Sequence, residues 1–149
     1  MTASHYTNIR EYLLTLATPR EELQGHAICP YIDQYIDHIT TSTHQSRDTV
    51  LAHVPTVIQS HTPAHVFECD FAWDWFDMES TINMLHHLYK QDDTEFLFMH
   101  PDSEDAPLAI GDYNYHIPLI ILQQRSVLKR ARNELAKNTN YYHTFNKLK

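Results

Sequence analysis

Cysteine and histidine side chains that could act together occur early in the sequence. Cys29 follows His26 by three residues in a segment that reads Gly25-His26-Ala27-Ile28-Cys29-Pro30-Tyr31. A cysteine in such a loop is a candidate thiolate nucleophile, and the His-x-x-Cys spacing can chelate a metal ion within a turn. The alternative is that Cys29 is a small buried side chain that anchors the Cys-Pro turn.

A second candidate pair, His100 and Asp102, follows the short apolar run 95–99. In open α/β sheets ligands bind outside the carboxyl ends of the strands, which is where this pair is expected. His100 is therefore a candidate base or metal ligand with Asp102 beside it, and the alternative is a turn that Asp102 caps. The candidate catalytic residues are Cys29, His100 and Asp102. The candidate ligands for a transition metal such as zinc are His26, Cys29 and His100.

Three further candidates, Tyr115, His116 and Arg125, flank the last predicted strand. Arg125 opens a basic helix, where a guanidinium beside a helix N-terminus can hold a carboxylate or a phosphate. These three residues are predicted to bind a small anionic ligand. Against this, a strand flanked by tyrosines is more often simple amphipathic packing.

The elements that would position these residues follow from hydrophobic periodicity and capping signals. Helices are predicted over 8–17, over 46–60 with Ser46 as the N-cap, over 74–90, and after Ser126 as an N-cap. Strands are predicted over 34–41, 64–70, 95–99 and 117–122. This alternation predicts one α/β domain over residues 1–149, a sandwich with a mixed or largely parallel sheet of about four short strands and flanking helices.

The helix over 74–90 has the clearest pattern in the sequence. Its main apolar stripe contains Trp75, Met78, Ile82, Leu85 and Tyr89. Trp73, Phe76 and Met84 lie on another side, which suggests that two faces of this helix are covered.

Composition excludes several classes of protein. Two glycines among 149 residues are too few for a Rossmann dinucleotide loop or a P-loop. No apolar run reaches the length of a membrane span, so no membrane association is expected. Two cysteines, Cys29 and Cys69, are too few for a disulfide framework, and reduced thiols in a cytoplasmic protein are expected.

Charge is unevenly distributed along the chain. Residues 1–122 carry 4 basic and 18 acidic side chains, whereas residues 123–149 carry 7 basic side chains and one acidic one. A basic last helix can dock on an anionic partner, or it can pack against its own acidic body. Because most of the chain is acidic, nucleic acid is not an expected partner.

Three segments together show a resemblance. Cys29-Pro30-Tyr31 resembles the Cys-Pro-aromatic motif of small uncharacterised bacterial and phage proteins that form a domain of unknown function, in which phenylalanine usually stands at the place of Tyr31. His100-Pro101-Asp102, and the run from Pro118 to Val127, resemble that family's His-Pro-Asp and its proline-led apolar run ending in Leu-Arg-x-x-Ser. This chain departs from the pattern in its Ile-Gly-Asp-Tyr loop and its tail, 140–149. The resemblance implies a site near Cys29, His100 and Arg125 and supplies no reaction.

The leading hypothesis is a small α/β protein that binds a small anionic ligand or a transition metal, with or without catalysis. Its pocket would be lined by His26, Cys29, His100, Asp102, His116 and Arg125. The alternative is a non-catalytic interaction or regulatory protein that docks on a partner through the basic C-terminal helix.

Overall fold

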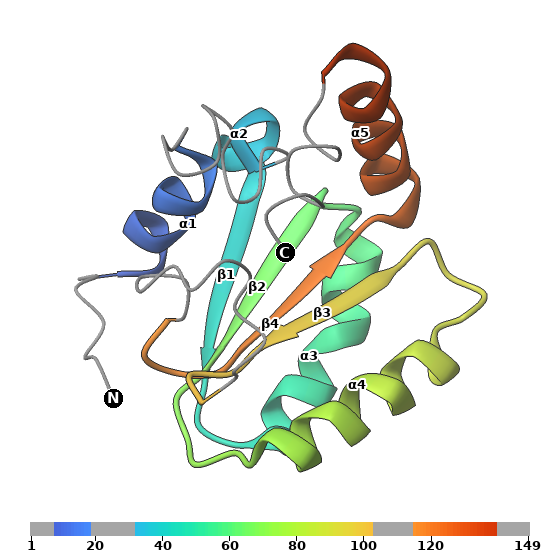
Figure 1. The fold of residues 1–149 in the computed structure, drawn as a ribbon. Coiled ribbons are helices and arrows are strands. Elements are labelled where there is room, and N and C mark those ends of the chain that lie inside the picture. Colours follow the sequence, from blue (N-terminus) through green and yellow to red (C-terminus); the bar gives the residue numbers. More distant parts are fainter. Residues whose placement is uncertain (1–7, 19–31, 103–114, 140–149) are drawn as a thin grey trace.

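The computed structural model describes residues 8–18, 32–102 and 115–139, which form five helices and four strands (Figure 1). The elements are α1 (Ile9–Ala17), α2 (Ile32–Tyr35), β1 (Ile39–His44), α3 (Arg47–Ser60), β2 (Ala64–Cys69), α4 (Trp75–Leu88), β3 (Glu95–Met99), β4 (Leu119–Gln123) and α5 (Arg125–Asn138). A 3₁₀ turn, Ile36–His38, joins α2 to β1. Within these ranges no helix combines the length and the apolar composition that a membrane crossing requires.

The four strands form one mixed sheet in the order β1-β2-β4-β3. β1 and β2 are parallel, with Ile39 opposite Ala64 and His44 opposite Cys69. β4 runs antiparallel to both of its neighbours, β2 and β3. The predicted α/β fold with a mixed four-stranded sheet is therefore confirmed.

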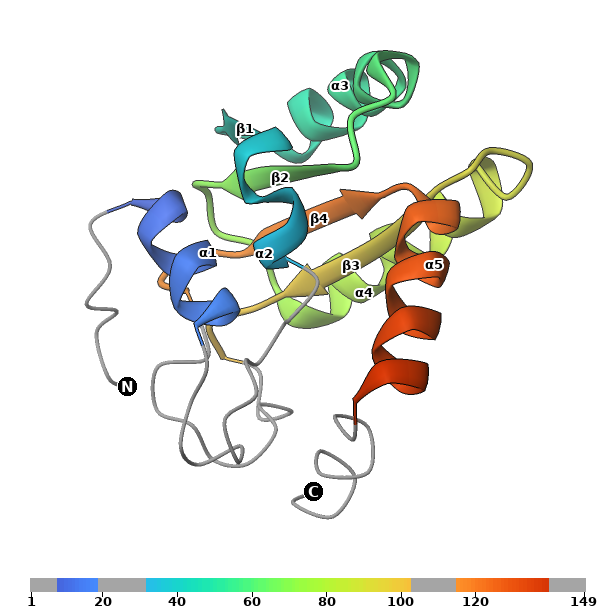
Figure 2. The same ribbon diagram turned by 90° about the horizontal axis from the view of Figure 1, so that it is seen from above.

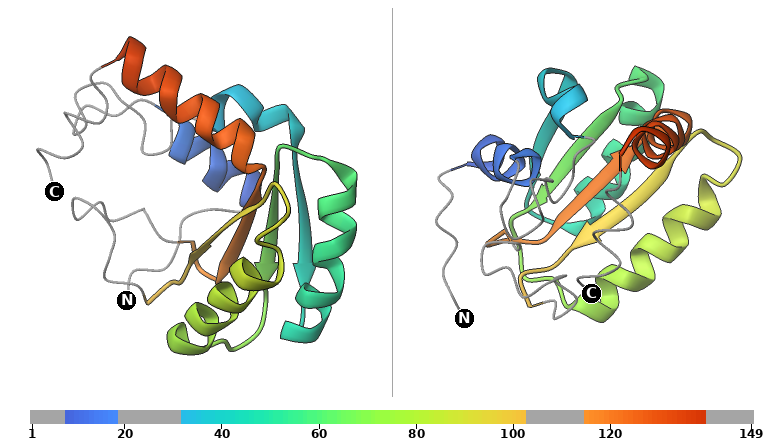
Figure 3. Two further views of the ribbon diagram at one scale, coloured as in Figure 1. Left: turned by 90° about the vertical axis from the view of Figure 1, so that its right-hand side faces the viewer. Right: turned by 45° about the horizontal axis from the view of Figure 1, so that its top comes forward.

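Helices cover both faces of the sheet, and the core has two layers (Figures 2 and 3). One layer joins α1 to one face of the sheet, and its buried members are Ile9, Tyr12, Leu13, Leu16, Val66, Met99, Tyr115, Leu119 and Ile121. The other layer joins α3 and α4 to the opposite face, and its buried members are Val50, Val54, Val57, Phe67, Cys69, Trp73, Met78, Ile82, Leu85, Phe96, Ile120 and Leu122. The alternation of side chains along each strand produces this division.

The helix starts follow their capping residues. Ser46 precedes α3, and its side chain accepts a hydrogen bond from the Thr49 N–H, as predicted. Asp74 precedes α4 and accepts from the N–H groups of Phe76 and Asp77. These side chains satisfy backbone donors that have no partner within the helix.

Two predictions about the elements were wrong. The predicted strand over 34–41 is a strand only from Ile39 to His44, because the residues before it form α2 and the 3₁₀ turn. The spacing of Tyr35, Ile36 and Ile39 fits a helical turn as well as a strand, so the pattern was ambiguous. Ser126 is not the N-cap of α5, since the helix already begins at Arg125, after Gln124.

Helix α4 is covered on one face, not on two. Met78, Ile82 and Leu85 are buried against the sheet. By contrast, the Phe76 and Met84 side chains are 73% and 41% exposed. Phe76 is therefore available to a ligand or to solvent.

Candidate functional site

An open cleft of about 890 Å³ lies where β2 and β3 end and β4 begins. Its wall includes four carboxylates, Asp70, Asp74, Asp77 and Asp102. It also includes four aromatic side chains, Phe71, Trp73, Trp75 and Phe76, and the histidines His100 and His116. The described wall contains no lysine or arginine. The cleft lies beyond the end of β3, where the sequence predicts a site, and that site stays a prediction.

His100 connects two sides of the cleft. It is buried at the end of β3, and its Nε2 lies 2.6 Å from the main-chain carbonyl oxygen of Trp73. Its Nδ1 accepts a hydrogen bond of 3.1 Å from the Asp102 N–H. The ring is therefore the neutral Nε2–H tautomer, with the proton donated to the Trp73 carbonyl.

This arrangement favours a positioning role for His100. Both ring nitrogens are already bonded to main-chain groups, so no lone pair faces the cleft. The Asp102 carboxylate lies 4.0 Å from His100 Nδ1 and its side chain is mostly exposed. His100 fixes the segment that carries Trp73, and Asp102 presents a carboxylate to the cleft.

Two pairs of aromatic rings form part of the cleft wall. Phe71 and Trp73 are stacked, with ring centroids 5.0 Å apart and an interplanar angle of 27°. Trp75 meets Phe76 edge to face at a centroid distance of 5.2 Å. Rings of this kind stack on planar ligands and attract cations to their faces.

Two of the four carboxylates have no partner among the described residues. The Asp74 side chain is used as the cap of α4, and Asp102 lies near His100. For the carboxylates of Asp70 and Asp77 no hydrogen bond or ion pair is found within the described parts of the chain, and both residues are exposed. They are the acidic groups best able to meet a ligand.

The candidates Tyr115 and His116, just before β4, lie in different environments. Tyr115 is buried, and its ring packs on Tyr12 at a centroid distance of 5.1 Å, which makes it a core residue. Burial also raises the pKa of the Tyr115 hydroxyl. His116 is exposed and lines the cleft.

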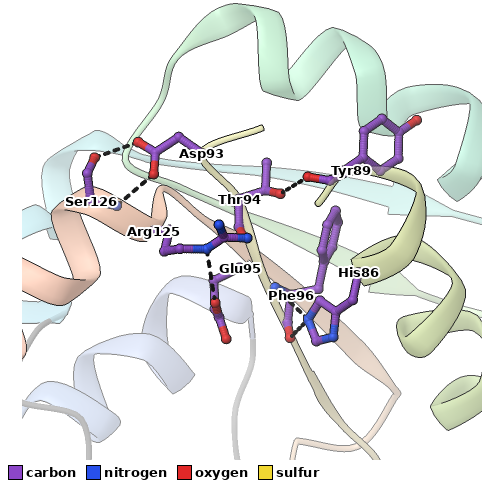
Figure 4. Close-up of polar contacts among 8 residues, drawn as sticks. All are labelled: His86, Tyr89, Asp93, Thr94, Glu95, Phe96, Arg125 and Ser126. Atoms are coloured by element: carbon purple, nitrogen blue, oxygen red, sulfur yellow. Dashed lines mark hydrogen bonds and ion pairs between the residues drawn. The ribbon is translucent and has the colours of Figure 1, made fainter. Parts of the chain in front are cut away.

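Arg125 lies beside Thr94 and Glu95, at the start of β3 (Figure 4). His100 follows the other end of β3. The Arg125 Nη2 donates a hydrogen bond of 2.8 Å to the Thr94 carbonyl oxygen, and its Nε lies 3.7 Å from the Glu95 carboxylate. The five residues of β3 span about 16 Å, so Arg125 does not reach the cleft. The structure thus brings His100, Asp102 and His116 together and leaves Tyr115 and Arg125 out.

Asp93, which lies near Arg125, caps the last helix. Asp93 accepts hydrogen bonds from the N–H and the hydroxyl of Ser126, in the first turn of α5. The hydrogen bond from the Ser126 side chain holds the pKa of Asp93 below its usual value. On the adjoining edge, His86 Nε2 lies 3.2 Å from the Phe96 nitrogen and 3.0 Å from its oxygen (Figure 4).

His26 and Cys29 lie outside the described residues, so the predicted metal site stays a prediction. Within the described ranges no group of three or more His, Cys, Asp or Glu side chains has an arrangement that could hold a metal ion. Cys69, the other cysteine, is a buried free thiol inside the core. Burial raises the pKa of this thiol to about 12, so Cys69 is not a nucleophile.

A second group of polar side chains, Ser42 and the histidines around it, was not predicted from the sequence. Thr40, Ser42 and His44 share one face of β1, and His65 lies on the same face of β2. Residues 40–44 are all polar, so no alternation in the sequence distinguishes the face of β1 that carries Thr40, Ser42 and His44. The strand was also predicted over 34–41, which leaves out Ser42 and His44.

Compared with protein-family models, with curated proteins and with solved structures, the chain matches none.

Proposed function

We propose that the protein binds a cationic ligand, one that carries ammonium or guanidinium groups, in the cleft beyond the ends of β2 and β3. One observation carries this proposal. The Asp70 and Asp77 carboxylates line the same open volume as the Trp75 and Phe76 rings, with no basic side chain in the described wall. Carboxylates and aromatic faces both attract cations, and cation–π contacts contribute about 0.5–2 kcal/mol each.

The proposed ligand is cationic, whereas the ligand predicted from the sequence is anionic. The expectation of an anion depended on Arg125, whose guanidinium lies at the far end of β3 and already contacts Thr94 and Glu95. An anion in the cleft would meet the Asp70 and Asp77 carboxylates without a compensating cation from the described wall. A transition metal held by His26, Cys29 and His100 remains a separate hypothesis.

Calorimetric titration at low ionic strength tests whether the ligand is positively or negatively charged. Spermidine is the cationic probe and glutarate the anionic one. We expect saturable binding of spermidine that weakens as salt is added, and no binding of glutarate. Binding of glutarate, or equal binding of both probes, would refute the proposal.

A second candidate function is docking of the basic helix α5 on an acidic protein surface. Lys129, Arg130 and Arg132 are exposed on α5. None of them makes an ion pair with an acidic side chain elsewhere in the described ranges. Replacing all three by alanine should abolish a salt-dependent interaction with an acidic partner, whereas Arg125→Ala should leave it largely intact. Loss with Arg125→Ala alone would contradict docking through the helix surface.

A cytoplasmic location belongs to the same proposal. Cys69 is a free thiol, and free thiols are typical of proteins in reducing compartments. Fractionation of cells that produce the full chain, followed by detection of the protein, tests this location.

A further inference from the structure

Three histidine rings gather between α3 and the sheet, and none of them lines the cleft. His44 on β1 and His65 on β2 are buried, and His53 on α3 is half-buried. The ring of His53 lies between the other two, with centroid distances of 5.6 Å to His44 and 5.5 Å to His65. Phe67 packs against all three rings. We call His44, His53 and His65 the histidine cluster.

Hydrogen bonds fix the protonation of His44. The Thr49 hydroxyl donates to the Ser46 carbonyl oxygen at 2.9 Å, so its oxygen is free to accept from His44 Nδ1 at 3.0 Å. Nδ1 therefore carries the ring proton. The other ring nitrogen, Nε2, then accepts from the Ser42 hydroxyl at 2.7 Å.

The same chain of hydrogen bonds continues to His65. Because the Ser42 proton is used on His44, Ser42 Oγ accepts from His65 Nε2, also at 2.7 Å. His65 Nδ1 then accepts from the Thr40 hydroxyl at 2.6 Å. All five groups are satisfied when both imidazoles are neutral. Adding one more proton to either ring reverses the donor and acceptor roles in part of this series of hydrogen bonds.

Among the described residues, no carboxylate is placed to compensate that proton. On α3 the charged residues besides His53 are Arg47 and Asp48, both exposed in its first turn. On β2 the carboxylate of Glu68 lies on the opposite face, where the Thr43 hydroxyl donates to it at 3.4 Å. The described part of β1 carries no charged side chain on the face of the cluster other than His44.

Burial and the repulsion between the charged forms of the rings both lower the pKa values of His44 and His65. Burial, and after it the charges of His53 and His44, lowers the pKa of His65 to about 4. Burial and then His53 also lower the pKa of His44. At pH values above the ordinary histidine pKa of about 6.5, neutral His44 and His65 favour the arrangement in which α3 packs on the sheet. This contribution to stability is lost as the pH falls below that value.

We propose that the histidine cluster makes the attachment of α3 to β1 and β2 sensitive to protons. When the rings are neutral, the cluster and the buried Val50, Val54 and Val57 hold α3 on the sheet. When the rings are protonated, α3 separates from β1 and exposes Phe67 and the apolar surface below it. Mild acidification then opens one side of the molecule while α4 and α5 stay in place.

Hydrogen exchange of the full chain at pH 8 and pH 5 tests this directly, after correction for the intrinsic effect of pH on exchange. A pKa of about 4 in the closed form and about 6.5 in the open form implies that the opening constant of α3 rises about 30-fold. In His65→Gln this pH dependence should largely disappear. In the control His87→Gln, which alters an exposed histidine on α4, it should persist.

Two results would overturn the proposal. One is exchange in α3 with the same pH dependence as in α4 and α5. The other is an unchanged pH dependence in folded His65→Gln. Should that variant fail to fold, proton NMR of the wild-type rings decides instead. A His65 titration near pH 4 supports the proposal, and a titration at about 6.5 or above refutes it.

Discussion

His100 and Trp73 are joined by a hydrogen bond of 2.6 Å from the His100 Nε2 to the main-chain carbonyl oxygen of Trp73. The bond connects the end of β3 to the segment between β2 and α4, which carries the aromatic wall of the cleft. The geometry of the cleft depends on this link, since His100 is buried and also accepts from the Asp102 N–H.

Replacing His100 should therefore destabilise the protein. His100→Ala leaves the Trp73 carbonyl and the Asp102 N–H without their partner and removes a buried ring. We expect a loss of about 2–3 kcal/mol in the free energy of unfolding. Urea denaturation measures it, with His116→Ala, an exposed histidine of the same cleft, as the control. A loss below about 0.5 kcal/mol for His100→Ala would contradict the positioning role.

Phe76 should contribute to binding and little to stability, because its side chain is 73% exposed. Phe76→Ala is expected to weaken spermidine binding about two- to fivefold, the magnitude of an exposed cation–π contact. Leu88→Ala removes an apolar side chain that is 61% exposed on the same helix and outside the cleft. Calorimetry should find wild-type affinity for Leu88→Ala. Equal losses in the two variants would argue against a role for the aromatic wall.

Asp93 should stabilise α5 in a pH-dependent way. Its carboxylate accepts from the Ser126 N–H and hydroxyl, and the resulting low pKa means that this stabilisation is present at neutral pH and lost on acidification below the ordinary aspartate pKa of about 3.9. Asp93→Ala should cost about 1 kcal/mol at pH 7. Its neighbour Asp92 is also exposed and makes no such side-chain bond to any described residue, so Asp92→Ala is the matched control. Thermal denaturation at pH 7 and pH 3 compares the variants, and a cost for Asp93→Ala that persists undiminished at pH 3 would contradict this account.

Cys69 should be inert in the folded protein. It is completely buried, and its thiol pKa is raised to about 12 by burial. Iodoacetamide is expected to modify Cys69 only after denaturation, at a rate that mass spectrometry of the Cys69 peptide follows. Rapid alkylation in the native state, or a stoichiometric Cys29–Cys69 disulfide in fresh protein, would be inconsistent with the structure.

Local signals predicted much of the fold. The helices that became α1, α3 and α4 have clear apolar stripes or caps, and Ser46 acts as the N-cap that its sequence context indicates. The start of β1 was misplaced because isoleucine and tyrosine fit both a helix turn and a strand. The exposure of Phe76 was not predictable from periodicity, since the pattern does not reveal which of two apolar faces meets the sheet.

The candidate site was predicted only in part, because strand direction is not a local property. His100 and Asp102 follow β3 and line the cleft, as expected for residues beyond the end of a strand. Arg125 would have joined them if β4 had run parallel to β3. It runs antiparallel, so the residues that follow β4 lie beside the beginning of β3, and Arg125 is next to Thr94.

Tryptophan fluorescence tests the central claim most directly, because the chain has only two tryptophans, Trp73 and Trp75, and both line the cleft. The wild type and the variant Asp70→Asn/Asp77→Asn are titrated with spermidine at low ionic strength, with Asp48→Asn as the control outside the cleft. We predict a saturable emission change in the wild type and in Asp48→Asn, and a midpoint at about fourfold or higher concentration in the double variant. An unchanged midpoint in the double variant, or no emission change in the wild type, would contradict binding of a cation in the cleft.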